Sequence, residues 1–160
     1  MYNKPIIVFE GIEGSGKTTH LKNIASYLKK RNVKYISLRE PGGSKNSELI
    51  RKIILNKKSD LHIFSDLLLY LAARNENINK IIKKNYKKKI ILIDRFIDST
   101  IAYQHYGMGI DYNLINSINK YLIKDINIDC TFLNTVSPKK LKVRLKKRRN
   151  LNKYDRFKLS

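Results

Sequence analysis

The sequence predicts an α/β fold in which a mostly parallel β-sheet carries helices on both of its faces. Short apolar runs that are typical of buried strands alternate along the chain with longer segments whose apolar residues recur at helical spacing. A glycine-rich loop joins the first run to the first helical segment. No repeat, linker or shift of composition divides the 160 residues, so we expect one domain, 1–160, with a single core.

The first half of the chain supplies two of the expected strands. Residues 5–10, PIIVFE, form a continuous apolar run, which is typical of a central strand buried on both faces. Residues 21–32, LKNIASYLKKRN, keep apolar residues at helical spacing and end on asparagine, a plausible stop. Residues 33–40, VKYISLRE, predict a second strand, which ends because the Pro-Gly-Gly sequence at 41–43 cannot continue it.

The second half repeats the alternation of strands and helices. The elements expected there are helices over 48–55 and 63–86, a strand over 90–93, helices over 99–106 and 112–123, a strand over 128–136, and a basic helix opened by Ser137-Pro138. Cys130 lies in the last apolar run, which predicts a buried strand. In such folds ligands bind beyond the carboxyl ends of the strands. Gly11, Arg39 and Asp94 stand at three of these ends, so they point to one crevice.

Lys and Arg total 34 against 13 Asp and Glu, which gives a net charge of +21. This charge fits nucleic acid, an anionic membrane surface or phosphorylated substrates, but the abundance of Lys, Ile, Asn and Tyr is also typical of an A+T-rich genome, the interpretation we favour. No segment has the ~18 apolar residues of a membrane span or the core of a signal peptide, and a single cysteine forms no internal disulfide. We therefore expect a cytoplasmic protein with no membrane partner and no specific nucleic-acid partner.

The glycine-rich loop, GIEGSGKT at residues 11–18, matches the phosphate-binding pattern G-x-x-x-x-G-K-[ST]. Glycines let the backbone wrap closely around phosphate at a helix N-terminus, Lys17 would reach the β- and γ-phosphates, and the Thr18 hydroxyl would ligate Mg²⁺. Because a strand precedes the loop and a helix follows it, the pattern predicts a three-layer P-loop NTPase fold. The expected ATP-binding residues are Gly11, Ile12, Glu13, Gly14, Ser15, Gly16, Lys17, Thr18 and Thr19.

Three separated motifs, FEGIEGSGKTT, REPGG and IDRFIDSTIAYQ, occur in the order and approximate spacing of one enzyme family. With them, residues 6–157 resemble thymidylate kinases, which phosphorylate dTMP with ATP. The resemblance implies an ATP- and Mg²⁺-dependent dTMP kinase of dTTP biosynthesis that produces dTDP and ADP in a homodimer. Three alternatives remain: a degenerate kinase that binds nucleotide or a partner without turnover, a kinase for another nucleoside monophosphate, and a nucleic-acid-binding protein.

The resemblance also implies roles for individual residues at the acceptor site. Arg95 would bind the acceptor phosphate, unless it only forms a surface ion pair with Asp94 or Asp98. Tyr70 and Arg74 lie four residues apart on one helix face, where they would stack on the thymine ring and donate to its carbonyl. The alternative is that Tyr70 belongs to the core and Arg74 is a surface cation.

Further acceptor residues follow from the same resemblance. Thr100 would contact the base, Tyr103 would crowd the place of a ribose 2′-hydroxyl, and Arg39 would lie beside the pocket. Asp94 and Glu10 end strands near the glycine loop, where they would hold Mg²⁺ or orient the acceptor phosphate, although either could be structural. The acceptor residues expected in full are Glu10, Arg39, Tyr70, Arg74, Arg95, Ser99, Thr100, Tyr103 and Gln104, and the metal ligands are Thr18, Asp94 and Glu10.

The basic stretch at 144–156 resembles the family's mobile lid and contains Arg144, Arg148, Arg149 and Arg156. The glycine loop has no arginine of its own, so a lid arginine is expected to close over the transferring phosphate. The catalytic residues expected are therefore Lys17, Arg95, Arg148 and Arg149. The alternative is a solvated basic tail. The family normally continues with further helices and a last strand, and without them we expect uncovered apolar surface on the sheet.

Overall fold

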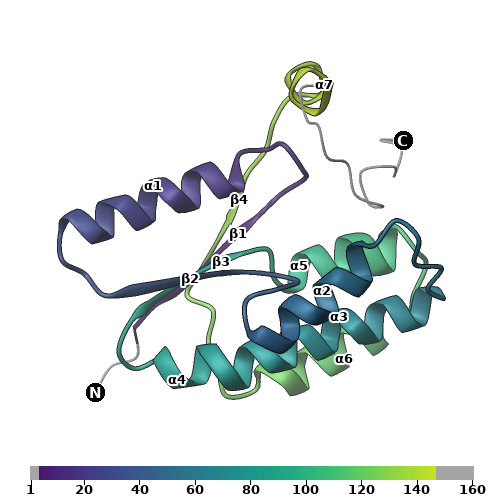
Figure 1. The fold of residues 1–160 in the computed structure, drawn as a ribbon, viewed down its shortest axis with the longest axis horizontal. Helices are drawn as coiled ribbons and strands as arrows, with labels where there is room; N and C mark the ends of the chain where they lie inside the picture. Colours follow the sequence, from purple (N-terminus) through teal and green to yellow (C-terminus); the bar gives the residue numbers. More distant parts are fainter. Residues whose placement is uncertain (1–3, 147–160) are drawn as a thin grey trace.

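Four parallel strands form the centre of the fold in the order β2-β3-β1-β4 (Figure 1). The computed structural model describes residues 4–146. The strands are β1 (Ile6–Glu10), β2 (Tyr35–Arg39), β3 (Ile90–Asp94) and β4 (Cys130–Leu133). Because β1 pairs with both β3 and β4, it is central, as its apolar sequence predicts. In the register of the sheet Asp94 lies opposite both Phe9 and Arg39, so the carboxyl ends of three strands meet at one edge.

One helix covers the first face of the sheet. Helix α1 (Lys17–Lys30) starts directly after the glycine loop and runs along β1 and β3 (Figure 1). Leu21 and Leu28 turn inward from it and pack with Phe9 and Leu92 in a buried cluster. The 3.6-residue periodicity predicted this face correctly.

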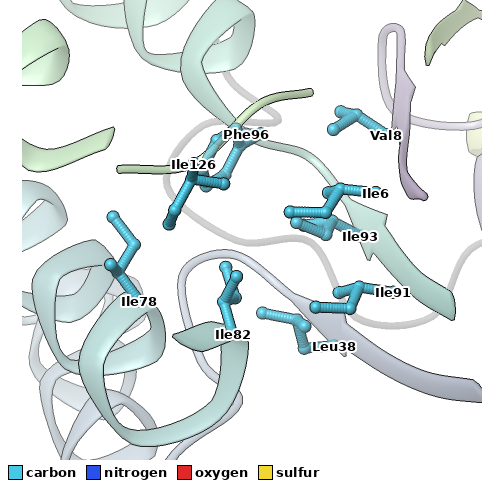
Figure 2. Packing of buried hydrophobic residues seen from close by; sticks show 9 residues of the cluster. All are labelled: Ile6, Val8, Leu38, Ile78, Ile82, Ile91, Ile93, Phe96 and Ile126. Carbon is cyan, nitrogen blue, oxygen red and sulfur yellow. The ribbon is translucent and has the colours of Figure 1, made fainter. Parts of the chain in front are cut away.

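The other face is covered by a layer of helices, which confirms the prediction of helices on both faces. The members of this layer are α3 (Ile63–Asn77), η1 (Ile78–Ile82), α4 (Lys83–Asn85), α5 (Ile97–Thr100), η2 (Ile101–Tyr106) and α6 (Tyr112–Ile123), with α2 (Lys45–Leu55) packed on α3. Figure 2 shows the main core between this layer and the sheet, where Ile78, Ile82 and Phe96 meet strand residues such as Ile91. Helix α7 (Pro138–Lys146) begins at the predicted proline. None of the helices within residues 4–146 is long and apolar enough to cross a membrane.

Two of the predicted helices contain π-helical turns, η1 and η2, that periodicity did not predict. A π turn adds one residue to the helical repeat and so rotates the residues that follow it. Ile78 and Ile82, at the two ends of η1, are both buried in the core. In η2 it accompanies the burial of Gln104 beside half-buried Tyr103. Helix α2 also starts three residues earlier than predicted, because the Ser44 side chain accepts a hydrogen bond from the Ser47 N–H and caps it.

The prediction that Cys130 lies in a buried strand is wrong. All four residues of β4 are exposed, and Phe132 and Leu133 keep 48% and 70% of their surface accessible. In the described sheet β4 is an edge strand that pairs only with β1, and an apolar run alone does not distinguish a central strand from an edge strand. The strand is also shorter than the predicted range 128–136.

Candidate active site

The glycine loop is built for an anion at the start of α1. Gly11 has a φ of 135°, and a Cβ on it would lie 2.3 Å from the carbonyl oxygen of Asn134, so no other residue fits there. Gly16 caps α1 in a left-handed conformation and offers no side chain to the first-turn N–H groups. These donors, together with the partial positive charge of the helix end, are available to phosphate.

Lys17 lies inside the loop, and its ammonium group donates to two loop carbonyls. Its Nζ is 2.8 Å from the oxygen of Gly11 and 2.9 Å from that of Ile12. Burial, followed by the nearby charge of Arg95, lowers the pKa of Lys17 to about 8. A charged phosphate would reverse this effect, because an opposite charge favours the protonated amine.

Thr18 and Asp94 bring two oxygen groups together below the loop. The Thr18 hydroxyl donates to the Asp94 carboxylate at 2.7 Å. Hydroxyl and carboxylate oxygens suit Mg²⁺, which usually takes one or two protein ligands and fills its octahedron with water and nucleotide phosphates. Among residues 4–146 no group of three or more acidic, histidine or cysteine side chains could hold a metal by itself.

Arg95 reaches from the end of β3 to the glycine loop. Its Nη1 donates to the Gly11 carbonyl at 2.9 Å, and its Nη2 pairs with the Glu13 carboxylate at 2.8 Å. Burial alone would lower the pKa of Arg95, but Tyr103 and then Glu13 raise it above the ordinary value. Its partner is therefore Glu13, and not Asp94 or Asp98 as the surface-pair alternative required. Arg95 also has a φ of 69°, which an arginine adopts only when its surroundings hold it.

Glu10 supports the loop that carries Arg95. Its carboxylate is buried and accepts from the N–H of Phe96 at 2.7 Å, from the N–H of Ser99 at 3.2 Å and from the Ser99 hydroxyl at 2.6 Å. The Ser99 hydroxyl in turn accepts from Arg95. Glu10 thus caps the start of α5, and its predicted role toward Mg²⁺ or the acceptor phosphate stays a prediction.

Arg74 is buried, with only 1% of its surface exposed, so the alternative of a surface cation is wrong. It forms an ion pair with Glu40 at 2.8 Å and stacks over the ring of Phe96. Burial raises the pKa of the Glu40 carboxyl, and the neighbouring Arg74 opposes this effect. An arginine in such a site is held in one orientation.

A single cleft brings most of the predicted residues together. Its walls combine the glycine loop with side chains from the end of β2, from α3 and from the α5–η2 helix. Predicted residues that line it are Glu13, Lys17, Thr18, Arg39, Tyr70, Arg74, Asp94, Arg95, Ser99, Thr100, Tyr103 and Gln104. Predicted residues that do not line it are Glu10, Gly11, Ile12, Gly14, Ser15, Gly16 and Thr19, the glycine-loop members of which stand beside it. Gln104 is buried and donates to Asp66, and its Oε1 has no hydrogen-bond partner among the described residues.

The sequence reasoning missed five cleft residues: Glu40, Pro41, Arg51, Leu55 and Phe96. The Arg51 side chain donates to the carbonyl of Pro41, and burial lowers its pKa. A signal for Arg51 was present, since Glu48, Arg51 and Leu55 fall on one face of α2 and Glu48 pairs with Arg39. For Glu40 the signal was its acidic side chain at the end of a predicted strand.

The region predicted as a lid is described only in part. Arg144 lies on α7, and its Nη1 donates to the Gly14 carbonyl at 2.7 Å. Arg148, Arg149 and Arg156 lie outside the described residues 4–146. A second, open cleft on this side of the glycine loop is lined by Ser15, His20, Asn134, Lys140 and Arg144, among others.

Comparisons with known proteins agree with this arrangement. A family model described as thymidylate kinase matches residues 9–160. The thymidylate kinase of Ehrlichia chaffeensis is 47% identical over 132 residues, which are 79% of this chain and 63% of that relative. The thymidylate kinase of Chlorobium luteolum is 36% identical over 140 residues, which are 87% and 65% of the two chains. The chain therefore spans just under two thirds of the length of these relatives.

A solved structure is also similar. The crystal structure of thymidylate kinase from Ehrlichia chaffeensis has a TM-score of 0.78 with this chain at 42% identity. The match covers 91% of this chain and 83% of that one. The three-layer P-loop fold predicted from the sequence is thereby confirmed.

Proposed function

The chain belongs to the thymidylate kinase family, and on that premise we propose that it transfers the γ-phosphoryl group of ATP to dTMP. One observation carries the proposal. A single cleft joins a phosphate-binding loop to a second cationic centre, Arg95, and to a wall of the right chemistry for a pyrimidine base. In the reaction a phosphate oxygen of dTMP forms a bond to the γ-phosphorus while the bond to the bridging oxygen of ADP breaks.

The donor half of the site lies at the glycine loop. The N–H groups at the start of α1 bind the phosphates, and Lys17 exchanges its two carbonyl partners for phosphate oxygens. Thr18 and Asp94 would hold Mg²⁺, which supplies neutralisation of the charge on the β- and γ-phosphates. Catalysis of this kind depends mostly on positioning and electrostatics, so the cleft requires no dedicated general base.

The acceptor half lies between Arg95 and α3. Arg95 exchanges Glu13 for the phosphate of dTMP, with Arg39 and Arg51 adding positive charge nearby. Tyr70 stacks on the thymine ring.

The polar atoms around the base complete the acceptor half. Arg74 donates to a carbonyl of the base, and the Oε1 atom of Gln104 accepts from its N–H. Thr100 contacts the base, and Tyr103 crowds the position of a ribose 2′-hydroxyl, which favours deoxyribonucleotides.

The basic region after β4 acts as a lid in this proposal. Arg144 already contacts the glycine loop through the Gly14 carbonyl, which places α7 beside the donor phosphates. Arg148 and Arg149, which follow on the chain, would close over the transferring group and exclude water. We retain both as catalytic candidates.

We further propose that the protein works as a cytoplasmic homodimer in dTTP biosynthesis. Helices α2 and α3 pack side by side (Figure 1) and both leave large apolar side chains exposed. These are Leu49 and Ile53 on α2, and Ile63, Phe64 and Leu68 on α3. A second copy of the chain would cover this surface. Leu49→Asp should then shift the species seen by sedimentation from dimer to monomer, whereas Lys22→Asp on α1, which covers the other face of the sheet, should not.

The activity is tested with purified protein, ATP, Mg²⁺ and dTMP. We expect dTDP and ADP in equal amounts, with dTMP preferred over dUMP, dGMP and AMP. Lys17→Ala and Arg95→Ala should abolish turnover, while Lys22→Ala, an exposed lysine later on α1, should leave it unchanged. A folded, monodisperse preparation that binds nucleotide but makes no dTDP would contradict the proposal and favour the degenerate kinase.

A further inference from the structure

The guanidinium group of Arg74 has a nearly complete set of protein partners. Its Nε donates to Glu40 at 2.8 Å, and its Nη2 donates to the carbonyl of Phe96 at 3.0 Å and to the hydroxyl of Thr100 at 2.8 Å. Its Nη1 donates to Oδ1 of Asn119, on α6, at 2.6 Å. A guanidinium group has five N–H donors, so one N–H, on Nη1, remains for a ligand.

Asn119 is the partner of the nitrogen that carries this last donor. The Phe96 ring, 5.0 Å away, fixes the plane of the guanidinium. All the N–H bonds of a guanidinium group lie in one plane, so the bond from Nη1 to Asn119, together with the bonds of Nε and Nη2, fixes the direction of the remaining N–H. Arg74 lines the acceptor cleft, whereas Asn119 is buried and does not line the cleft.

The two polar atoms of the Asn119 amide differ in their hydrogen bonds. Its Oδ1 serves Arg74, while its Nδ2 is buried without a hydrogen-bond partner in the part of the chain that the structure describes. A buried amide donor without a partner is unfavourable, so stability alone does not explain an asparagine here. A carboxylate would leave no donor unpaired, but Glu40 already balances the charge of Arg74, and a second negative charge would weaken the cleft for an anionic acceptor.

We propose that Asn119 is a positioning residue that sets base selectivity through Arg74, an inference that rests on the proposed function. A single N–H held in one direction matches a carbonyl oxygen of the base, such as O4 of thymine. It opposes an amino group at the same place, as in cytosine, because two donors would then meet. The acceptor oxygen of Asn119 thus makes the cleft prefer dTMP and dUMP over dCMP.

The test compares Asn119→Leu, which keeps the branched shape and the number of side-chain heavy atoms but has no acceptor, with Asn119→Asp, which keeps the acceptor oxygen. In steady-state assays we expect Asn119→Leu to raise the KM for dTMP with little change in kcat. We also expect the ratio of kcat/KM for dTMP over dCMP to fall roughly tenfold, the effect of misplacing one hydrogen bond to a charged group. Asn119→Asp should restore the ratio. Asn113→Ala, an exposed asparagine on the same helix, is the matched control.

Calorimetric binding of dTMP and dCMP to the same proteins gives a second readout. If Asn119→Leu does not fold, Asn119→Ser, whose hydroxyl is too short to reach Arg74, takes its place. An unchanged dTMP to dCMP ratio in a folded variant overturns the assignment while the kinase proposal stands. A wild-type protein that neither binds nor phosphorylates dTMP removes both, so the two failures are distinguishable.

Discussion

The buried position of Lys17 disfavours the protonated form of its amine, and a bound phosphate favours that form. Burial lowers the pKa of this lysine from 10.5 to about 8. Between these two values the unfolded chain binds the proton more tightly than the folded protein does. The free energy of unfolding therefore rises with pH over this interval, and below pH 8 the penalty for the charged lysine is constant.

A pH series tests this property of Lys17. Relative to Lys17→Met, the wild type should gain up to about 3 kcal/mol in unfolding free energy between pH 8 and pH 10.5, measured by denaturant titration. Binding of ATP should weaken in the wild type above pH 8, since the neutral amine attracts phosphate poorly. In Lys17→Met, unfolding free energy should not show this rise between pH 8 and pH 10.5, and ATP binding should not weaken above pH 8. Parallel curves for the two proteins would show that Lys17 keeps an ordinary pKa.

Glu40 and Arg74 form a buried pair whose two members need each other. Glu40→Ala would leave the guanidinium charge without its carboxylate, and such losses cost about 3–5 kcal/mol. Denaturant unfolding should show this decrease. Arg39→Ala, which breaks the exposed pair between Arg39 and Glu48, should change stability by less than about 1 kcal/mol. Similar losses in both variants would contradict the distinction between the buried and the exposed pair.

The sequence predicts which single residues belong to the site better than it predicts the direction in which their side chains point. Lys17, Thr18 and Arg95 line the cleft because a short motif places them on one loop or strand end. Glu10 was assigned to ligands from its place at a strand end, yet its carboxylate faces the N–H groups at the start of α5. Which way a side chain turns depends on partners distant in the chain. Arg51 was missed for the same reason.

Among the elements, α3 holds the Pro-Gly-Gly turn through one side chain. Oδ1 of Asn77 accepts from the Ser44 N–H at 3.0 Å, and its Nδ2 donates to the Gly42 carbonyl at 2.6 Å. Asn77 is fully buried, so Asn77→Ala would strand two polar groups away from water.

We expect Asn77→Ala to lose about 1–3 kcal/mol of unfolding free energy, measured by denaturant titration. The KM for dTMP should also rise, because the turn connects Arg39 to the helix of Arg51. Asn79→Ala, at an exposed asparagine on the adjoining η1, should change neither quantity. If both substitutions had the same effect, the turn would not depend on the Asn77 side chain.

Periodicity predicted the type of each element more reliably than its details. The long helix predicted over 63–86 exists, but it contains the π turn η1, which the spacing of apolar residues does not reveal. Helix α2 starts at Lys45 because Ser44 caps it, and a search for apolar spacing overlooks such a cap. The prediction that β4 is buried failed for another reason. The number of strands that pair with a given strand is a property of the whole sheet, and the sequence of one strand does not reveal it.

The whole molecule places its binding chemistry at one edge of the sheet. This could be predicted from the sequence, because parallel strands bring Glu10, Arg39 and Asp94 to the same side. The basic residues behind the net charge of +21 are spread over the chain, so charge alone did not locate the cleft. The glycine loop and the other two sequence motifs indicated its position.

At the scale of the whole molecule, β4 exposes an edge that invites further pairing. Its outer side has no strand partner in residues 4–146, and Leu133 keeps 70% of its surface accessible. An exposed apolar edge strand pairs readily with another chain, so the 160-residue protein should form species larger than a dimer as its concentration rises. Leu133→Lys places a charge on that edge and should suppress these species in sedimentation velocity experiments. Leu114→Lys, at an exposed leucine of α6, is the control and should not. Because the proposed dimer uses α2 and α3, Leu133→Lys should leave the dimer intact, and its conversion to monomer would instead place the dimer contact at β4.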